Sequence, residues 1–233
     1  MLAVLQGLTE FLPVSSSGHL LLPAALFGWQ DQGLTLDIAV HLGTLAAVIL
    51  YLRRDLMGLV AGSYKWLLKR EESYESRLAL KLIVATLPAG LAGLALRAVI
   101  EANARSLAIV AATSIIFAVL LWLADRSGAR RANAVPFSEL TVPGALFIGV
   151  AQAFALIPGT SRSGVTMTAA RFLGFTREDS ARFSFLLSIP IILASGLALV
   201  GANRTASAAI DSMTLGYAAA VSALVAFLTI HFF

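Results

Sequence analysis

The chain contains five uninterrupted apolar stretches, each close to the length of a membrane-spanning helix. A helix needs about 20 apolar residues to cross the roughly 30 Å hydrocarbon core of a bilayer. Only 13% of the residues are charged, and the mean hydropathy is +0.85, which is too apolar for a water-soluble domain. The sequence therefore predicts an all-α polytopic membrane protein. Its expected spans are residues 36–53, 78–98, 106–124, 183–202 and 213–233.

The remaining composition narrows the class of protein further. Because the chain has no cysteine, it has neither disulfides nor thiolate metal sites. Its net charge of +4 comes from basic residues dispersed between the apolar stretches, so no basic patch indicates a nucleic-acid partner. Met1 begins directly in apolar sequence, without a basic region or a small-residue cleavage site. We therefore expect no removable signal peptide.

Two further apolar regions are interrupted by polar and helix-breaking residues. Residues 1–29 contain PVSSSG, which leaves apolar arms of about 12 and 11 residues, and a helical arm of that length reaches only about 17 Å. Residues 140–175 contain PGTSRSG, although their first arm is almost long enough to span. Backbone broken at membrane depth is tolerated where it is buried in protein or faces a water-filled cavity. Both regions are therefore interpreted as re-entrant helical hairpins.

The two interrupted regions also resemble each other. Residues 4–29 align with residues 150–175 without gaps, and seven of 26 positions are identical. The shared S-x-S-G motif is more specific than shared Ala and Val, and an internal repeat explains it best. An aromatic residue, Trp29 or Phe175, ends each copy. The identical pairs are Val4/Val150, Gln6/Gln152, Ser15/Ser161, Ser17/Ser163, Gly18/Gly164, Ala24/Ala170 and Gly28/Gly174.

The basic residues orient these two copies in the membrane. Residues 53–81 are rich in Lys and Arg, and the positive-inside rule predicts that this segment is cytoplasmic. Within it, the amphipathic run YKWLLKREESYESR is expected to be a solvated loop on the bilayer surface. Tracing the chain from there places most of the 17 basic residues on the cytoplasmic side. This set also contains Arg126, Arg130, Arg131, Arg171, Arg177 and Arg182, whereas Arg97, Arg105 and Arg204 fall outside.

Three spans separate the two hairpins in this topology. An odd number of crossings inverts the second copy, which is the inverted-repeat plan with broken helices meeting near the bilayer midplane. We therefore expect a first repeat at 1–124 and a second at 140–233, forming a single membrane domain. Since the second copy has one span fewer than the first, a final helix is expected to be missing.

The second break carries residue types that bind anions. The guanidinium of Arg162 presents a planar fork of donors that matches phosphate or carboxylate oxygens. Glycines let the backbone approach an anion, while hydroxyls and the N-terminus of a helix starting near Gly164 add donors. We interpret this break as a phosphate cradle. Its expected phosphate-binding residues are Gly159, Thr160, Ser161, Ser163 and Thr166, joined by Ser15, Ser17 and Gly18 of the first break.

The first break supplies groups that a phosphate cradle lacks. Glu10 lies four residues after Gln6, on the same helical face, and is a candidate base. The serine hydroxyls are candidate nucleophiles, and His19 can exchange a proton near neutral pH. Ionisable groups inside a membrane are costly and mark a site by default.

The same polar residues also have structural interpretations. Any single intramembrane serine is as often bonded to its own backbone or packed closely as functional. Glu10 and Arg162 could pair as architecture alone. His41 and His231, each alone on an apolar span, are expected to be structural or lipid-facing, and no role is assigned to them. The convergence of carboxylate, hydroxyl, imidazole and guanidinium in two related breaks favours a functional site.

The strings QGLTEFLPVSSSGHL and PGTSRSGVT closely resemble the undecaprenyl-pyrophosphate phosphatase family, the bacitracin-resistance type of membrane enzyme. That family carries the motifs (E/Q)-x-x-x-E, S-S-x-G-H and P-G-x-S-R-S-x-x-T, found here at Gln6–Glu10, Ser15–His19 and Pro158–Thr166. The resemblance extends to FSFLLSIP (183–190) and covers essentially the whole chain. Carried over by position, Glu10, Ser16, His19 and Arg162 are the family's catalytic residues.

The resemblance implies hydrolysis of a polyprenyl diphosphate to the monophosphate and inorganic phosphate. This step recycles the lipid carrier of cell-wall synthesis, confers bacitracin resistance and takes place in the bacterial plasma membrane, with the site open to the outer side. The attacking group is Ser16, His19 or water, and the sequence does not choose among them. The expected partners are the lipid substrate and membrane lipids, and two-helix hairpins in a small bundle make a homodimer reasonable.

Two alternatives stay open. Many family members have Glu where this chain has Gln6, and an amide is a weaker cation ligand than a carboxylate. A Mg²⁺ or Ca²⁺ ion is thus a candidate cofactor at Glu10, with Gln6 only as a weak ligand. A transporter or flippase for a lipid phosphate or another anion would share the inverted-repeat plan. The SSSGH string with Glu10 favours the enzyme, since transport alone needs no nucleophile.

Overall fold

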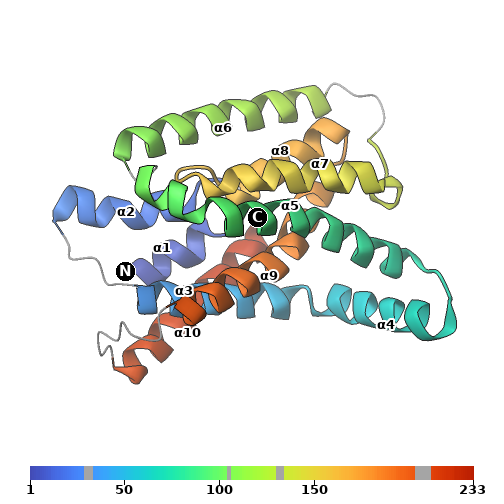
Figure 1. Ribbon diagram of the computed structural model, residues 1–233, viewed down its shortest axis with the longest axis horizontal. Helices are drawn as coiled ribbons and strands as arrows, with labels where there is room; N and C mark the ends of the chain where they lie inside the picture. Colours follow the sequence, from blue (N-terminus) through green and yellow to red (C-terminus); the bar gives the residue numbers. More distant parts are fainter. Residues whose placement is uncertain (29–33, 104–105, 130–133, 203–210) are drawn as a thin grey trace.

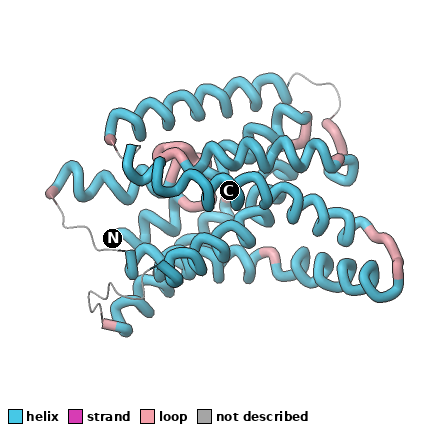
Figure 2. The backbone as a smooth tube through the Cα atoms, in the orientation of Figure 1, coloured by secondary structure: helices cyan, strands magenta, loops and turns pink. Residues whose placement is uncertain are grey.

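A computed structural model describes the chain except for residues 29–33, 104–105, 130–133 and 203–210. The described residues form helices joined by loops and contain no strand (Figure 2). The expectation of an all-α protein is therefore confirmed. The sequence-predicted features Trp29, Arg105, Arg130, Arg131 and Arg204 lie outside the described residues.

Ten α-helices and two short 3₁₀ helices make up the described part of the chain (Figure 1). The first half contains α1 (Leu2–Thr9), α2 (Ser16–Phe27), α3 (Leu34–Tyr51), α4 (Arg53–Lys69), α5 (Tyr74–Asn103) and α6 (Leu107–Ala129). The second half contains η1 (Phe137–Glu139), α7 (Val142–Ala153), η2 (Phe154–Leu156), α8 (Arg162–Leu173), α9 (Arg177–Ala202) and α10 (Ser212–Phe232).

Four of these helices are long and apolar enough to cross a membrane. They are the segments Tyr74–Leu96, Leu107–Gly128, Arg177–Leu197 and Ser212–Phe232, which correspond to four of the five expected spans. The expected span 36–53 is not one of these four, because α3 ends at Tyr51 and the chain bends by 75° before α4 begins. Among the described residues, the pair Thr35–Tyr51 and Arg53–Lys69 passes as a fifth span when the two helices are taken together.

The expectation of a solvated loop over YKWLLKREESYESR is wrong for most of that run. Helix α4 continues to Lys69 and α5 begins at Tyr74, so only residues 70–73 connect them. Ser73 and Ser76 exchange side-chain and backbone hydrogen bonds of 3.0 and 3.2 Å, which start α5 with a reciprocal cap. At Gly62, α4 packs so closely on α5 that an added Cβ would lie 2.8 Å from the Cβ of Glu75. The amphipathic pattern is thus a helical one that is stabilised by packing.

Both interrupted regions form two short helices around a break, at α1–α2 and at α7–α8. Helices α2 and α8 have 12 residues each and begin and end at positions that the repeat alignment makes equivalent. A serine, Ser15 or Ser161, caps each N-terminus, and a left-handed glycine, Gly28 or Gly174, caps each C-terminus. This correspondence supports the internal repeat. The inverted orientation stays a prediction.

Small residues let the remaining helices pack closely around the interrupted regions. A Cβ added at Gly43 of α3 would lie 2.2 Å from the carbonyl oxygen of Ala219 in α10. The Ser222 hydroxyl of α10 donates to the Val40 carbonyl at 2.9 Å. In Figure 1, α6 lies along one side above α7 and α8, α3 and α10 lie on the other side of α5, and α9 crosses from α8 toward α3. The interrupted regions are therefore held between two groups of helices.

Candidate functional site

The two breaks meet in the structure, as the sequence pattern predicts. The Ser163 hydroxyl, at the start of α8, donates to the Leu12 carbonyl of the first break at 2.8 Å. A Cβ added at Gly164 would lie 3.4 Å from the Cβ of Pro13. Residues about 150 positions apart in the sequence therefore share one polar centre.

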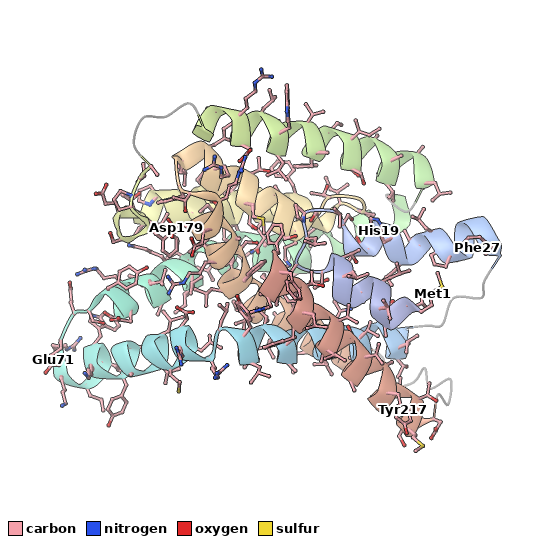
Figure 3. All side chains as sticks on the ribbon, turned by 180° about the vertical axis from the view of Figure 1, so that it is seen from behind. Met1, His19, Phe27, Glu71, Asp179 and Tyr217 are labelled. Atoms are coloured by element: carbon pink, nitrogen blue, oxygen red, sulfur yellow. The ribbon has the colours of Figure 1, made fainter. Side chains whose placement is uncertain are left out.

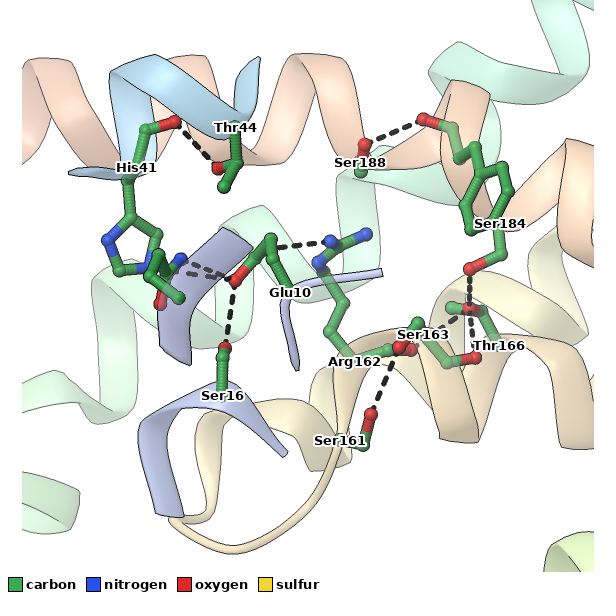
Figure 4. Close-up of polar contacts among 12 residues, drawn as sticks. Glu10, Ser16, His41, Thr44, Ser161, Arg162, Ser163, Thr166, Ser184 and Ser188 are labelled. Carbon is green, nitrogen blue, oxygen red and sulfur yellow. Dashed lines mark hydrogen bonds and ion pairs between the residues drawn. The ribbon is translucent and has the colours of Figure 1, made fainter. Parts of the chain in front are cut away.

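Glu10 is the centre of this polar cluster (Figure 4). Its Oε2 accepts hydrogen bonds from Gln6 Nε2 and Ser16 Oγ, both at 2.8 Å. Its Oε1 accepts from Arg162 Nη2 at 2.9 Å, and this contact is also an ion pair. The side chains of Glu10 and Arg162 are only 5% and 12% exposed. A buried carboxylate needs such partners, because burying an unpaired charge is very costly.

Ser16 reaches Glu10 because of an unusual backbone conformation just before α2. Ser15 has φ = 60° and ψ = 90°, a region that residues other than glycine rarely adopt. Its hydroxyl nevertheless caps the helix by accepting from the Gly18 amide at 3.3 Å. Local strain of this kind occurs frequently at active sites. The strained turn makes Ser16 the first residue of α2, within hydrogen-bond reach of the carboxylate.

Arg162 is the first residue of α8, which a serine also caps, although Ser161 has ordinary extended backbone (φ = −71°, ψ = 123°). The Ser161 hydroxyl accepts from the Gly164 amide at 3.1 Å and caps the helix. Helix α6 holds the preceding turn, since Thr113 and Ser114 donate to the carbonyls of Pro158 and Gly159 at 2.7 and 3.0 Å. The second helix starts two residues earlier than expected, and this places the guanidinium beside Glu10.

Helix α9 packs against both breaks through its FSFLLSIP segment (183–190). Thr166 of α8 and Ser184 of α9 are joined by a buried hydrogen bond of 2.7 Å. The rings of Phe11 and Phe185 meet edge to face at 5.5 Å between centroids. These contacts explain why a motif without catalytic side chains accompanies the two polar ones.

The polar cluster lies at the edge of a cavity of about 820 Å³. One part of the wall is polar and comes from both breaks, whereas α5 and α9 supply mainly apolar and small residues. The cavity can therefore accept an amphiphilic ligand with an anionic head. Its polar lining includes Glu10, Ser15, Ser16, Ser17, Thr160, Ser161 and Arg162, and its apolar lining includes Leu87, Leu91, Leu94, Ile191, Ile192 and Ala194.

Not every sequence-predicted site residue faces this cavity. Ser163 and Thr166 are buried and engaged in contacts within the protein, and the Gly18 amide is taken up by the Ser15 cap. The Gly159 carbonyl accepts from Ser114. These four residues, together with His19, are not among the described residues that line the cavity.

His19 turns toward its own helix. Its Nδ1 lies 2.8 Å from the Ser15 carbonyl, so this nitrogen carries a proton. Figure 3 shows His19 on α2, at the end of the molecule where Met1 and Phe27 also lie. No described contact joins His19 to Glu10 or Arg162, and its predicted catalytic role rests on the family resemblance.

His41 is a cavity residue that the sequence reasoning missed. The lipid-facing half of its expected role is wrong, because its Nε2 lies 3.8 Å from Glu10 Oε2 and it lines the cavity, whereas the structural half stays a prediction. Its Nδ1 lies 2.7 Å from the Asp37 carbonyl and must carry a proton there. The Nε2 atom is thereby directed to the polar cluster. The only sequence signal was a titratable residue inside an apolar span.

Comparison with known proteins shows where this arrangement belongs. Residues 1–233 match the family model described as Bacitracin resistance protein BacA. The chain belongs to this family. It is 50% identical to an undecaprenyl-diphosphatase of Saccharophagus degradans over 232 residues, which is 100% of this chain and 86% of that relative. It is 49% identical to an undecaprenyl-diphosphatase of Alcanivorax borkumensis over 233 residues, 100% of this chain and 87% of the relative.

Family membership confirms the resemblance inferred from the motifs. The BacA match and the apolar helices together make this a multi-pass membrane protein. Relatives named undecaprenyl-diphosphatase also include one from Teredinibacter turnerae, 48% identical over 237 residues. The match covers both breaks, so the cluster around Glu10 lies within the part of the chain that these relatives share.

Proposed function

We propose that this protein is an integral membrane phosphatase that hydrolyses undecaprenyl or another polyprenyl diphosphate to the monophosphate and inorganic phosphate. The observation that carries this proposal is the Ser16 Oγ atom, 2.8 Å from a Glu10 carboxylate that also pairs with Arg162. A hydroxyl, a base and a cation at this spacing are the groups that phosphoryl transfer requires. The names of the relatives support the same reaction.

Arg162 is suited to hold the diphosphate head. While its Nη2 donates to Glu10, its buried Nη1 has no hydrogen-bond partner among the described residues. That atom can donate to a phosphate oxygen and offset charge that develops on the transferred group. The apolar lining from α5 and α9 is suited to the first isoprenyl units of the lipid.

Ser16 is the attacking group that the geometry favours. Its oxygen attacks the terminal phosphorus as Glu10 accepts the hydroxyl proton, and the bond from that phosphorus to the bridging oxygen breaks. The polyprenyl monophosphate leaves with the bridging oxygen. The proton that Glu10 accepted then passes to this leaving group or to solvent. Water then hydrolyses the phosphoserine and releases inorganic phosphate.

Attack by Ser16, by His19 or by water each predicts a different result when an intermediate is trapped. Phosphate recovered on Ser16 supports serine attack, and phosphate recovered on His19 would require that side chain to turn toward the cavity. If no phosphoenzyme forms under efficient trapping, Glu10 activates a water molecule instead. Protein quenched in denaturant at neutral pH, where both phosphoserine and acid-labile phosphohistidine persist, and then analysed by mass spectrometry distinguishes the three.

A divalent cation fits this site only when the substrate shares in holding it. Across the described residues, no three His, Asp or Glu side chains converge as a metal site. Gln6 Oε1, however, is a buried acceptor without a donor among the described residues, next to Glu10. Gln6 and Glu10 would hold Mg²⁺ or Ca²⁺ together with diphosphate oxygens. The ion would neutralise charge on those oxygens.

The function is tested by phosphate release from undecaprenyl diphosphate by purified protein. Wild type is expected to release phosphate, and Arg162→Ala and Glu10→Gln are expected to lose nearly all activity. Absence of release by folded wild-type protein would overturn the phosphatase. Movement of lipid phosphate across proteoliposomes without release would instead favour the transporter or flippase, for which the comparisons offer no support.

We place the protein in the bacterial plasma membrane, with the site open to the outer side. The basic segment 53–81 supports this orientation, and Glu71 within it lies at the opposite end of the molecule from Met1 and Phe27 (Figure 3). Because the chain has no cysteine, single cysteines introduced near Glu71 and Phe27 can be labelled with an impermeant maleimide. The homodimer is tested by the mass of the detergent-solubilised protein.

A further inference from the structure

Two buried polar side chains in the cavity wall have no hydrogen-bond partner in the part of the chain that the structure describes. Gln152 is 1% exposed and Thr160 is 3% exposed, and both line the cavity. Neither amide atom of Gln152, nor the hydroxyl of Thr160, has a hydrogen-bond partner among the described residues. Burying such groups unpaired costs free energy. Side chains that bear this cost inside a cavity are suited to bind a polar ligand.

The repeat explains why the Gln152 amide has no hydrogen-bond partner in the described ranges of the chain. Gln152 aligns with Gln6, whose Nε2 donates to Glu10 four residues later. The residue that aligns with Glu10 is Leu156, which also lines the cavity and cannot accept a hydrogen bond. The second copy therefore keeps the buried amide but has lost its carboxylate. The same position serves the catalytic base in one copy and is available to a ligand in the other.

We propose that Gln152 and Thr160 form an uncharged subsite for phosphate oxygens of the diphosphate head. The proposal rests on the phosphatase function and adds a binding residue, Gln152, outside the motifs that identify the family. The amide nitrogen and the hydroxyl each donate to a phosphate oxygen, and the amide oxygen accepts from a protonated phosphate or a bound water. Neutral donors hold these oxygens without adding a second cation beside Arg162.

The test uses Gln152→Met and Thr160→Val, which keep shape and remove the polar atoms. The matched control is Thr86→Val. Thr86 also lines the cavity, but its hydroxyl already donates to the Leu82 carbonyl at 2.7 Å. The probe is a methylene-bridged polyprenyl diphosphonate, which binds without being hydrolysed. Each test variant is expected to bind it about tenfold more weakly, and the control is expected to bind it as wild type does.

Thermal unfolding of the ligand-free protein separates binding from a structural role. Removing an unpaired buried polar group does not lower stability, so the Tm of both test variants is expected to equal or exceed that of wild type. A fall in Tm, or probe affinity within twofold of wild type in both variants, would overturn the subsite. Gln152→Glu adds a further test, since its carboxylate repels phosphate and is expected to weaken binding more than Gln152→Met does.

These outcomes are distinct from failure of the phosphatase itself. If wild type releases no phosphate from undecaprenyl diphosphate but binds the diphosphonate through Gln152, the reaction is wrong and the subsite holds. If wild type releases phosphate and Gln152→Met does so with unchanged KM, the subsite is wrong and the reaction holds.

Discussion

Ser16 and Arg162 occupy equivalent positions in the two copies of the repeat, and each donates to a different oxygen of Glu10. Ser16 Oγ lies 2.8 Å from Oε2, and Arg162 Nη2 lies 2.9 Å from Oε1. Each residue is the first of a 12-residue helix that a serine caps. The scaffold is thus repeated, while the chemistry differs at one position, which provides a hydroxyl in one copy and a cation in the other.

Replacing Ser16 by Ala is expected to lower kcat for phosphate release by about 10²-fold or more, because the attacking oxygen is removed. The matched control is Thr9→Val, since the adjacent Thr9 hydroxyl donates to the Leu5 carbonyl and has no described contact with Glu10. The control is expected to retain wild-type kcat. A Ser16→Ala enzyme with more than a tenth of wild-type kcat would exclude serine attack and leave His19 or water as the nucleophile.

Arg162→Lys is expected to lose activity although it keeps the positive charge. An ammonium group lacks the planar fork that lets Arg162 hold Glu10 through Nη2 while Nη1 donates to a phosphate. We expect kcat/KM to fall by about tenfold or more, as is typical when a bidentate contact is lost. Arg177→Lys, at an exposed ion pair with Asp125, is the control and should be neutral. Equal activity of both variants would show that charge alone suffices at position 162.

The sequence predicted the meeting of the two breaks because polar residues at membrane depth are costly and must find partners. The pairing of Gln6 with Glu10 also follows from a spacing of four residues on one helix. Local rules of this kind are sufficient to predict a polar centre that contains Glu10 and Arg162. They depend on composition and short spacing, which a single sequence displays directly.

What the sequence did not reveal depends on how the helices rotate against one another. The packing of α3 on α10, with the Ser222–Val40 hydrogen bond next to His41, holds His41 near Glu10, and no local pattern carries that information. Ser163 and Thr166 belong to a motif that predicts phosphate contact, yet tertiary packing directs both hydroxyls to partners in the protein. Residue type and spacing identify the polar segments, and packing decides which side chains reach the cavity.

Gln6→Glu is expected to make the site respond more strongly to divalent cations. The new carboxylate would replace the amide that donates to Glu10, so two negative groups would face each other at the distance of that 2.8 Å bond. A shared cation relieves this repulsion. Thermal unfolding with and without Mg²⁺ should therefore show a larger rise in Tm for Gln6→Glu than for wild type. Gln6→Met, which also loses the hydrogen bond but adds no charge, is the control. A rise equal to that of Gln6→Met would argue against a cation beside Glu10.

Gly43→Ala is expected to destabilise the protein, because the packing of α3 on α10 leaves no room for a methyl group. The added Cβ would lie 2.2 Å from the Ala219 carbonyl oxygen, so the helices would have to separate, at a cost of about 1–3 kcal/mol. Gly216→Ala, in α10 where no atom lies within 4 Å of the added Cβ, is the matched control. It should be neutral or stabilising, since Ala favours a helix over Gly by about 1 kcal/mol.

Thermal unfolding in detergent measures both glycine variants, and the phosphate-release assay adds a functional readout. Because α3 also carries His41, separation of α3 from α10 is expected to lower activity in Gly43→Ala even below its unfolding temperature. Equal Tm values for Gly43→Ala and Gly216→Ala would mean that the two helices are not held at the distance described, and the placement of His41 beside Glu10 would then lose its structural support.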